Sequence, residues 1–224
     1  MNPTSLTRAA ALAAAVAGVL FIAVQINHPA MDVASVTTTE WAIRNIAKVV
    51  LSALALAGIT GMYLRQIRPA GVLGLVGYLL FSVGFLAMLS IAFVAATVLP
   101  TVAGRQPAYV QDVLDAAAGG SATGDIGLIQ PALLVSAAGY LLGGLLFGVA
   151  LFRARVLARW AAALLAAGTA GTVALQVLPQ SFERPFAVPT GVALIGLGLS
   201  LWRHPRADRT PVAPIRHTEP ATAR

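Results

Sequence analysis

The sequence predicts an all-α fold: a polytopic bundle of six transmembrane helices with both chain ends on the cytoplasmic side. Three observations support this prediction, namely long apolar stretches, few charges and an alternating placement of basic residues. Of the 224 residues, 58% are hydrophobic and only 10% are charged, whereas a soluble domain carries about 25% charged residues. Most of the chain is therefore expected to lie in lipid rather than in water.

Each apolar stretch is close to the length that a membrane-spanning helix requires, which is about 20 residues for a hydrocarbon core of roughly 30 Å. The stretches cover residues 9–26, 41–64, 72–99, 131–152, 156–178 and 186–202. The first follows Arg8 and could be a signal peptide, but it is long for one and ends in Asn27-His28-Pro29 rather than in small residues. We therefore expect it to be retained as a helix.

Basic residues alternate between the segments that separate these stretches. The chain start, the second break, the fourth break and the chain end hold most of them: Arg8, Arg65, Arg68, Arg153, Arg155, Arg159, Arg203, Arg206, Arg209, Arg216 and Arg224. The other breaks hold only Arg105 and Arg184. Because cytoplasmic loops are enriched in Arg and Lys, this pattern predicts cytoplasmic termini in a bacterial inner membrane. It also accounts for the net charge of +7 without a nucleic-acid partner.

Residues 1–204 are expected to form one membrane domain, followed by a disordered tail over 205–224 that lacks apolar periodicity. The long outer loop, 101–129, contains a helical pattern of apolar residues: Tyr109, Val110, Val113, Leu114 and Ala117. This pattern predicts a short amphipathic helix across the outer mouth of the bundle. Loops of this length can be functional lids or simple connectors, and both interpretations stay open.

Small residues are frequent within the stretches. Gly144 and Gly148 have the G-x-x-x-G spacing that lets helices approach closely in lipid. We favour packing within one bundle, with a homodimer through small-residue helix faces as the alternative. The chain has no cysteine and only three scattered histidines, so we expect neither a metal site nor a cofactor.

One group of polar residues requires a functional explanation, because charges within a membrane segment are costly. Glu40, Arg44 and Lys48 recur at four-residue spacing and share one face of a helix, near the interfacial Trp41. Lys48 lies about 10–12 Å inward of Glu40. Other polar residues gather at the same predicted depth: Gln25, Asn27, His28, Gln130, Gln176 and Glu183. The inner halves of the stretches are almost purely apolar, so the sequence predicts a polar cavity that opens to the outer side.

Two residues of this group have more than one interpretation. His28 could exchange protons near neutral pH or could be a hydrogen-bonded helix cap beside Asn27. Glu183 lies next to Arg184 in a turn that is bounded by prolines, so it is either a catalytic carboxylate or part of a solvated charge pair. No established catalytic motif accompanies them.

Four segments resemble those of small six-span actinobacterial membrane proteins, most of which have no assigned function. The segments are Val-Gln-Ile-Asn-His-Pro (24–29), Leu-Ala-Gly-Ile-Thr-Gly-Met-Tyr-Leu-Arg-Gln (56–66), Tyr-Leu-Leu-Gly-Gly-Leu-Leu-Phe-Gly (140–148) and Arg-Ala-Arg-Val-Leu-Ala-Arg-Trp-Ala (153–161). The size, the number of spans and the expected outer cavity also resemble the integral membrane terpene cyclases of bacterial meroterpenoid pathways. This second resemblance implies proton-initiated cyclisation of an isoprenoid substrate, without a cofactor.

Within the cyclase hypothesis, a carboxylic acid donates the first proton. The predicted catalytic residues are Glu40, Asp112, Asp115, Glu183 and His28, with Asp32 and Asp125 as weaker candidates for the acid. The predicted substrate-binding residues are Gln25, Asn27, Trp41, Arg44, Lys48, Gln130 and Gln176. The alternatives are a non-catalytic protein that binds an anionic lipid or drug through Arg44 and Lys48, for example an efflux or immunity accessory, and a structural membrane subunit without a ligand.

Overall fold

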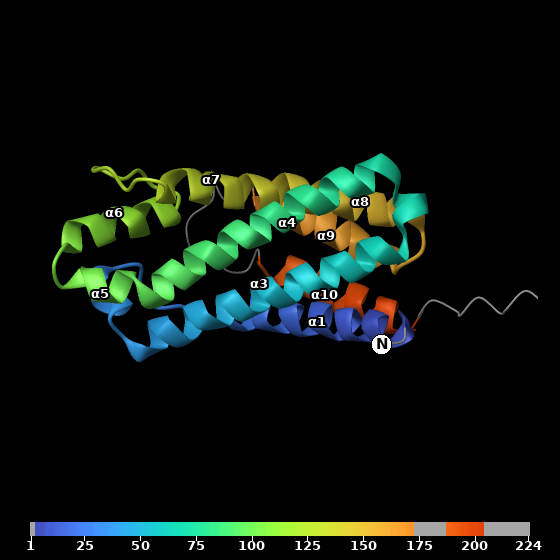
Figure 1. Ribbon diagram of the computed structural model, residues 1–224, viewed down its shortest axis with the longest axis horizontal. Helices are drawn as coiled ribbons and strands as arrows, with labels where there is room; N and C mark the ends of the chain where they lie inside the picture. The colour runs from blue at the N-terminus through green and yellow to red at the C-terminus, as the bar shows by residue number, and fades with distance from the viewer. Residues whose placement is uncertain (1–2, 173–186, 204–224) are drawn as a thin grey trace, which may run out of the picture.

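The computed structural model describes residues 3–172 and 187–203, and these residues form helices and loops without a strand (Figure 1). The long helices are α1 (Pro3–Ala23), α3 (Thr39–Arg65), α4 (Ile67–Thr97), α9 (Arg159–Gly171) and α10 (Ala187–Arg203). A further long helix consists of α7 (Ile129–Ala138), the π-helical turn η1 (Gly139–Gly143) and α8 (Gly144–Ala154). Three short helices are α2 (Val33–Val36), α5 (Leu99–Ala103) and α6 (Pro107–Ala117).

Four of the described helices are long and apolar enough to cross a membrane: α1, α3, α4 and the α7–α8 helix. The expected all-α fold and its apolar spanning helices are thus confirmed. Helix α10 has 17 residues, which gives about 26 Å at 1.5 Å per residue, somewhat less than a hydrocarbon core. The fifth predicted stretch is described only as far as Thr172, so the six spans and their orientation stay predictions.

The ends of these helices follow from local chemistry. Thr38 caps α3 by accepting a hydrogen bond from the backbone N–H of Trp41 at 3.2 Å. Near the start of α4, Gly71 interrupts the helix with φ of 58°, a left-handed conformation that glycine adopts without a Cβ penalty. The short turn between α3 and α4 therefore reverses the chain direction within a few residues.

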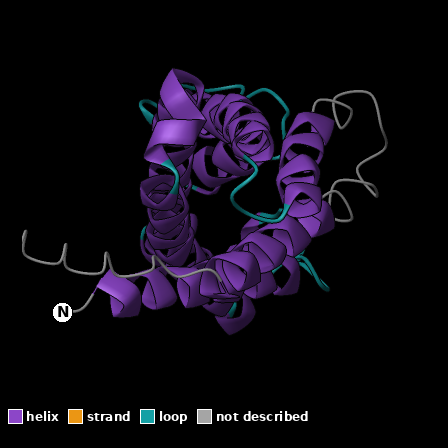
Figure 2. Cartoon of the chain, turned by 90° about the vertical axis from the view of Figure 1, so that its right-hand side faces the viewer, coloured by secondary structure: helices purple, strands orange, loops and turns teal. Residues whose placement is uncertain are grey.

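The long helices form a closed ring around an apolar core. Helix α1 packs against α3 and α10, α3 against α4, α4 against α8, α8 against α9, and α9 against α10. Viewed along the bundle, the helices surround a common centre (Figure 2). The aromatic side chains of Phe81, Phe85 and Phe147 are fully buried in the core of this ring.

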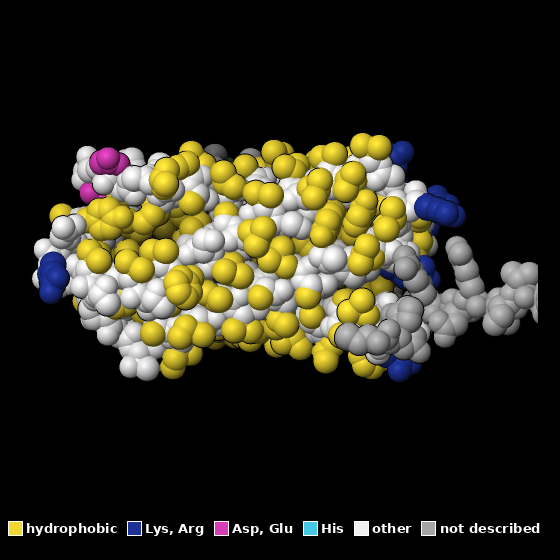
Figure 3. Space-filling view, viewed as in Figure 1, with side chains coloured by type: hydrophobic (Ala, Val, Ile, Leu, Met, Phe, Trp, Pro, Cys, Tyr) yellow, Lys and Arg dark blue, Asp and Glu magenta, His cyan; other side chains and the backbone are white. Residues whose placement is uncertain are grey.

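The two ends of the bundle differ in charge. One end, here called the arginine end, carries the basic residues at the start of α1, at the α3–α4 and α8–α9 turns and at the end of α10: Arg8, Arg65, Arg68, Arg153, Arg155, Arg159 and Arg203. The opposite end, here called the cavity end, carries α2, α5, α6 and the loop over residues 118–128. On the face that Figure 3 shows, an apolar band separates the basic groups at the arginine end from the acidic groups and a further basic group at the cavity end.

Glycines let the helices meet closely from the arginine end to the middle of the bundle. A Cβ on Gly77 would overlap the backbone of Phe147, and a Cβ on Gly143 would overlap the backbone of Phe81. The backbones of α4 and of the η1–α8 segment are therefore in direct contact. Gly144 and Gly148 of the G-x-x-x-G motif pack on Thr169 and Ala166 of α9 within the same chain. Close approach of this kind requires small residues in lipid.

The helices separate toward the cavity end. The last part of α4, residues 86–97, contains no glycine, and neither does α7. No residue of α7 is buried, whereas α8 in the continuation of the same helix buries Phe147, Leu151 and three small residues. The backbone contact that glycines allow is thus not available over this stretch, and a hollow lies between the two helices.

Candidate functional site

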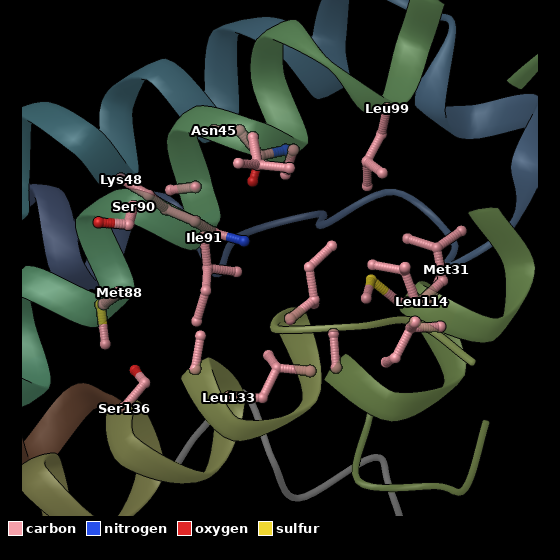
Figure 4. Close-up of a pocket in the computed structure, with 18 of the residues that line it drawn as sticks. Met31, Asn45, Lys48, Met88, Ser90, Ile91, Leu99, Leu114, Leu133 and Ser136 are labelled. Atoms are coloured by element: carbon pink, nitrogen blue, oxygen red, sulfur yellow. The ribbon is translucent and has the colours of Figure 1, made fainter. Parts of the chain in front are cut away.

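The hollow at the cavity end is a cavity of about 880 Å³. Its walls come from the end of α1, the first half of α3, the last half of α4, helix α6, the loop over residues 125–128 and helix α7. Figure 4 shows side chains from α3, α4 and α7 facing one another across it. Most of these residues are apolar, among them Met88 and Ile91 of α4 and Leu133 of α7.

Most of the small polar side chains at the cavity wall are bonded to the backbone. The side-chain amide of Asn45 donates to the carbonyl of Trp41 at 2.9 Å, and the hydroxyl of Ser90 donates to Leu86 at 3.0 Å. The hydroxyl of Ser136 reaches the carbonyl of Gly84 at 3.4 Å. These side chains therefore already donate hydrogen bonds to backbone carbonyls of the protein.

Lys48 is the basic residue of the cavity wall, and its amine nitrogen projects between α4 and α7 (Figure 4). The Nζ atom lies 3.1 Å from Nε2 of His28, and Nδ1 of His28 lies 2.9 Å from the carbonyl oxygen of Pro29. The imidazole tautomer with its proton on Nδ1 satisfies both contacts: Nδ1–H donates to Pro29, and Nε2 accepts from the ammonium of Lys48. Within the described part of the chain, no carboxylate lies within 4.0 Å of Lys48.

Arg44 has a structural role one helical turn away. Its Nη1 donates to the carbonyls of Val24 and Ile26 at 3.2 and 2.7 Å, and Nη2 donates to Asn27 at 2.9 Å. Its Nε and Nη2 also donate to one carboxylate oxygen of Glu40 at 3.0 and 2.7 Å. All five N–H groups of the guanidinium are thus occupied, and Arg44 binds the carbonyls of the turn that follows α1.

The predicted proton donors are engaged elsewhere. Glu40 pairs with Arg44, and its side chain is 55% exposed. Asp115 accepts from the side-chain amide of Gln111 on the same helix at 2.9 Å. Asp112 accepts from the backbone N–H and hydroxyl of Thr123 and from the N–H of Gly124. None of these three carboxylates belongs to the cavity wall.

Hydrogen bonds also keep the carboxyl group of Asp112 in its charged form, which makes it a poor proton donor. The backbone N–H of Thr123, then its hydroxyl, lower the pKa of Asp112 below the ordinary value of 3.8 because they stabilise the charged carboxylate. The pKa of Asp32 is lowered in the same way by the backbone N–H of Ser35, the residue that it caps at the start of α2. Among the described residues, Asp125 is the carboxylate that lies at the cavity wall, and it accepts from the N–H of Gly127 at 2.7 Å.

The other predicted site residues divide into three groups. Gln25 and Trp41 line the cavity, and Trp41 also joins α3 to α4 through a 2.8 Å bond from Nε1 to the carbonyl of Ala95. Asn27 and Gln130 lie near the cavity without lining it. The backbone carbonyl of Asn27 accepts a hydrogen bond from Arg44, and Gln130 lines a separate pocket of about 340 Å³ beside the 120–126 loop. Gln176, Glu183 and the 205–224 tail lie outside the described residues.

Sequence reasoning missed Asn45, which lies on the wall between Trp41 and Lys48. These three residues have i, i+4, i+7 spacing and therefore share one helical face. The face that lines the cavity is thus Trp41–Asn45–Lys48 and not the predicted Glu40–Arg44–Lys48. Attention to the apolar periodicity of α3, rather than to its charges alone, would have identified this face.

Helix α6 covers the cavity end through a small hydrophobic core of its own. Val110, Val113 and Leu114 are buried against Val36 of α2 and Leu99 of α5. Gln111 adds a 3.4 Å hydrogen bond to the carbonyl of Met31. The same cluster includes Trp41 of α3 and Ala95 of α4, so the cover packs directly on the long helices.

Comparison with protein-family models, with curated proteins and with solved structures found no match to this chain. Both resemblances suggested by the sequence therefore stay predictions. Among the described residues, no group of three metal-ligating side chains is close enough to hold a metal ion. The function is accordingly argued from the cavity itself.

Proposed function

We propose that this protein is a multi-pass membrane protein of the bacterial inner membrane that binds a lipophilic small molecule in the cavity between α3, α4 and α7. In this proposal the arginine end lies in the cytoplasm, and six helices cross the bilayer. The cavity then opens toward the outer side. The apolar band between the two charged ends supports this placement.

The observation that carries the proposal is the size and lining of the cavity. Its volume of about 880 Å³ lies in the range of small-molecule sites, roughly 300–1,000 Å³. Its mostly apolar walls, with Lys48 and Asp125 as the charged residues among those described, match the composition of such sites, in which apolar contacts supply affinity and a few polar groups fix orientation. Close packing elsewhere in the bundle makes a void of this size costly unless a ligand fills it.

Filling the cavity tests the proposal. Ala132 lines the cavity, whereas Ala137 of the same helix is exposed and does not. Binding of a fluorescent farnesol derivative would be measured in nanodiscs by titration. We expect Ala132→Phe to weaken binding about tenfold or more and Ala137→Phe to leave it unchanged. Equal binding by the wild type and Ala132→Phe, or no binding by the wild type, would refute the proposal.

Proton-initiated cyclisation of an isoprenoid chain is the second candidate, and the aromatic cluster below the cavity supports it. Phe21 lines the cavity and stacks on Tyr140 with ring centroids 6.0 Å apart. Phe81 and Phe85 contact the same tyrosine. Aromatic faces stabilise positive charge and could accompany a carbocation.

In this second candidate the acid is Asp125, because it is the carboxylate at the cavity wall, rather than Glu40 as the charge pattern suggested. The proton added at the start is lost at the end, so the product has the mass of the substrate. Incubation of membranes with a prenylated indole would yield an isomer of equal mass, and Asp125→Asn would abolish it while Glu40→Gln would not. Absence of the isomer with wild-type protein excludes cyclisation of that substrate class.

A further inference from the structure

We infer that the ligand of this cavity is an anionic amphiphile whose carboxylate or phosphate head pairs with Lys48 while its chain lies along the apolar walls. The inference rests on the proposed function, because it specifies the chemistry of the molecule that the same cavity binds. Its basis is a single side chain: an ammonium inside an apolar cavity, about 14 Å along α3 from its first residue.

The charge of Lys48 has no counter-charge among the described residues. The nearest acidic residue on its own helix face, Glu40, is already paired with Arg44 at 2.7 Å. Asp125 also borders the cavity but lies beyond 4.0 Å from Lys48. An ammonium removed from water without an anionic partner is strongly destabilising, and an acidic head group would supply that partner.

The partner that Lys48 does have, His28, positions the ammonium without neutralising it. A lysine ammonium has three N–H donors. One is directed at Nε2 of His28 at 3.1 Å, and the Nδ1 contact with Pro29 is satisfied when the ring proton lies on Nδ1, which leaves Nε2 to accept this bond. Lys48 lines the cavity, where a carboxylate or phosphate can accept the two remaining donors.

Three uncharged polar side chains of the cavity wall leave the head group to Lys48. Asn45, Ser90 and Ser136 are bonded to backbone carbonyls and do not compete for the ligand. A cationic amphiphile would bring a second positive charge beside Lys48 and is disfavoured. A neutral alcohol can enter, but it accepts a weaker hydrogen bond from the ammonium than an anion does.

The test compares four probes: dodecanoate, dodecyl phosphate, dodecanol and inorganic phosphate. Each would compete with the fluorescent farnesol derivative for wild-type protein in nanodiscs made of zwitterionic lipid. We expect both anionic amphiphiles to bind about ten to a hundred times more tightly than dodecanol, as a charge-assisted hydrogen bond implies. Inorganic phosphate alone should not compete, because it makes no contact with the apolar walls.

Substitution of Lys48 separates the head-group claim from the cavity claim. Lys48→Met should bind dodecanol as the wild type does and should lose its preference for the two anions, whereas Lys48→Arg should keep most of that preference. Arg105→Met, at an exposed position outside the cavity, is the control for net charge and should behave as the wild type.

The following results would contradict the head-group inference, the amphiphile or the proposed function. If wild-type protein binds dodecanoate, dodecyl phosphate and dodecanol equally, the head-group inference is wrong and the lipophile site stands. The same conclusion follows if Lys48→Met keeps the anion preference. Competition by inorganic phosphate as strong as that by dodecyl phosphate would replace the amphiphile with a free anion. If neither the farnesol derivative nor any amphiphile binds, the proposed function itself fails.

Discussion

Helices α7 and α8 belong to one long helix, but they pack in opposite ways. Toward the arginine end, α8 presents Gly144 and Gly148 to α9 and buries Phe147 against α4. Toward the cavity end, α7 has no glycine and no buried residue, and it borders a cavity of about 880 Å³. The difference shows that glycines mark where α4 and its partner helix are in backbone contact, and that the cavity lies where glycine is absent.

The turn η1 marks the boundary between these two regions. Its five residues, Gly139–Gly143, are π-helical, and such turns often occur at functional sites. Tyr140 within it donates a 2.8 Å hydrogen bond to Thr190 of α10 and stacks on Phe21. Tyr140 thereby links the buried core to Phe21, which lines the cavity.

The largest expected effect comes from destroying the close packing. Gly77→Leu would place a side chain where the backbone of Phe147 already lies, which forces α4 and α8 apart at a cost of more than about 3 kcal/mol. We expect a loss of monodisperse protein on size-exclusion chromatography in detergent. Gly104→Leu is the matched control, because nothing lies within 4 Å of that position. Similar behaviour of the two variants would contradict the packing argument.

A smaller effect is expected at the boundary between α1 and α3. Arg44→Met leaves the carbonyls of Val24, Ile26 and Asn27 without this donor and should lower the free energy of unfolding by about 2 kcal/mol. Thermal unfolding in detergent would measure the loss. Lys48→Met, on the same helix, should not lower stability, because it removes an ammonium that has no counter-charge among the described residues and bonds to His28 alone among them. A larger loss for Lys48→Met would reverse the roles assigned to these two cations.

The smallest effect concerns the cover of the cavity. Asp112→Ala releases the loop at Thr123 and Gly124, and amide hydrogen exchange over residues 119–127 should become severalfold faster at neutral pH. Asp115→Ala is the control, since Asp115 bonds to Gln111 of its own helix. Unchanged exchange in Asp112→Ala would show that apolar contacts alone hold the cover.

The pKa of Asp112 gives the same prediction a pH dependence. Its folded-state pKa lies below the ordinary 3.8, so its contribution to stability is present above pH 3.8 and is lost as the pH falls through the lowered value. Wild-type protein should therefore retain its exchange protection over 119–127 from neutral pH down to about pH 4. Loss of protection near pH 6 would point to a different titrating group.

The local pattern of apolar and charged residues predicted much of the fold. The apolar stretches coincide with the long helices because helix formation in lipid depends on length and hydrophobicity, which are properties of each segment alone. The pattern of Val110, Val113 and Leu114 likewise corresponds to buried residues of α6. Lys48 was selected as a site residue because a charge within an apolar stretch is conspicuous without any knowledge of its neighbours.

What the sequence determined by itself was therefore the helical, lipid-facing character of the chain, the placement of its arginines and the presence of a cation at depth. Only the tertiary structure decided that Arg44 binds the turn that follows α1, that Lys48 faces a cavity and that Trp41 and Asn45 share its wall. The physical reason is rotation: the orientation of α3 about its axis is set by the packing of Leu51, Ala55 and Ile59 against neighbouring helices. A spacing of four residues shows which side chains share a face, but the partner that this face meets depends on residues far away in the chain.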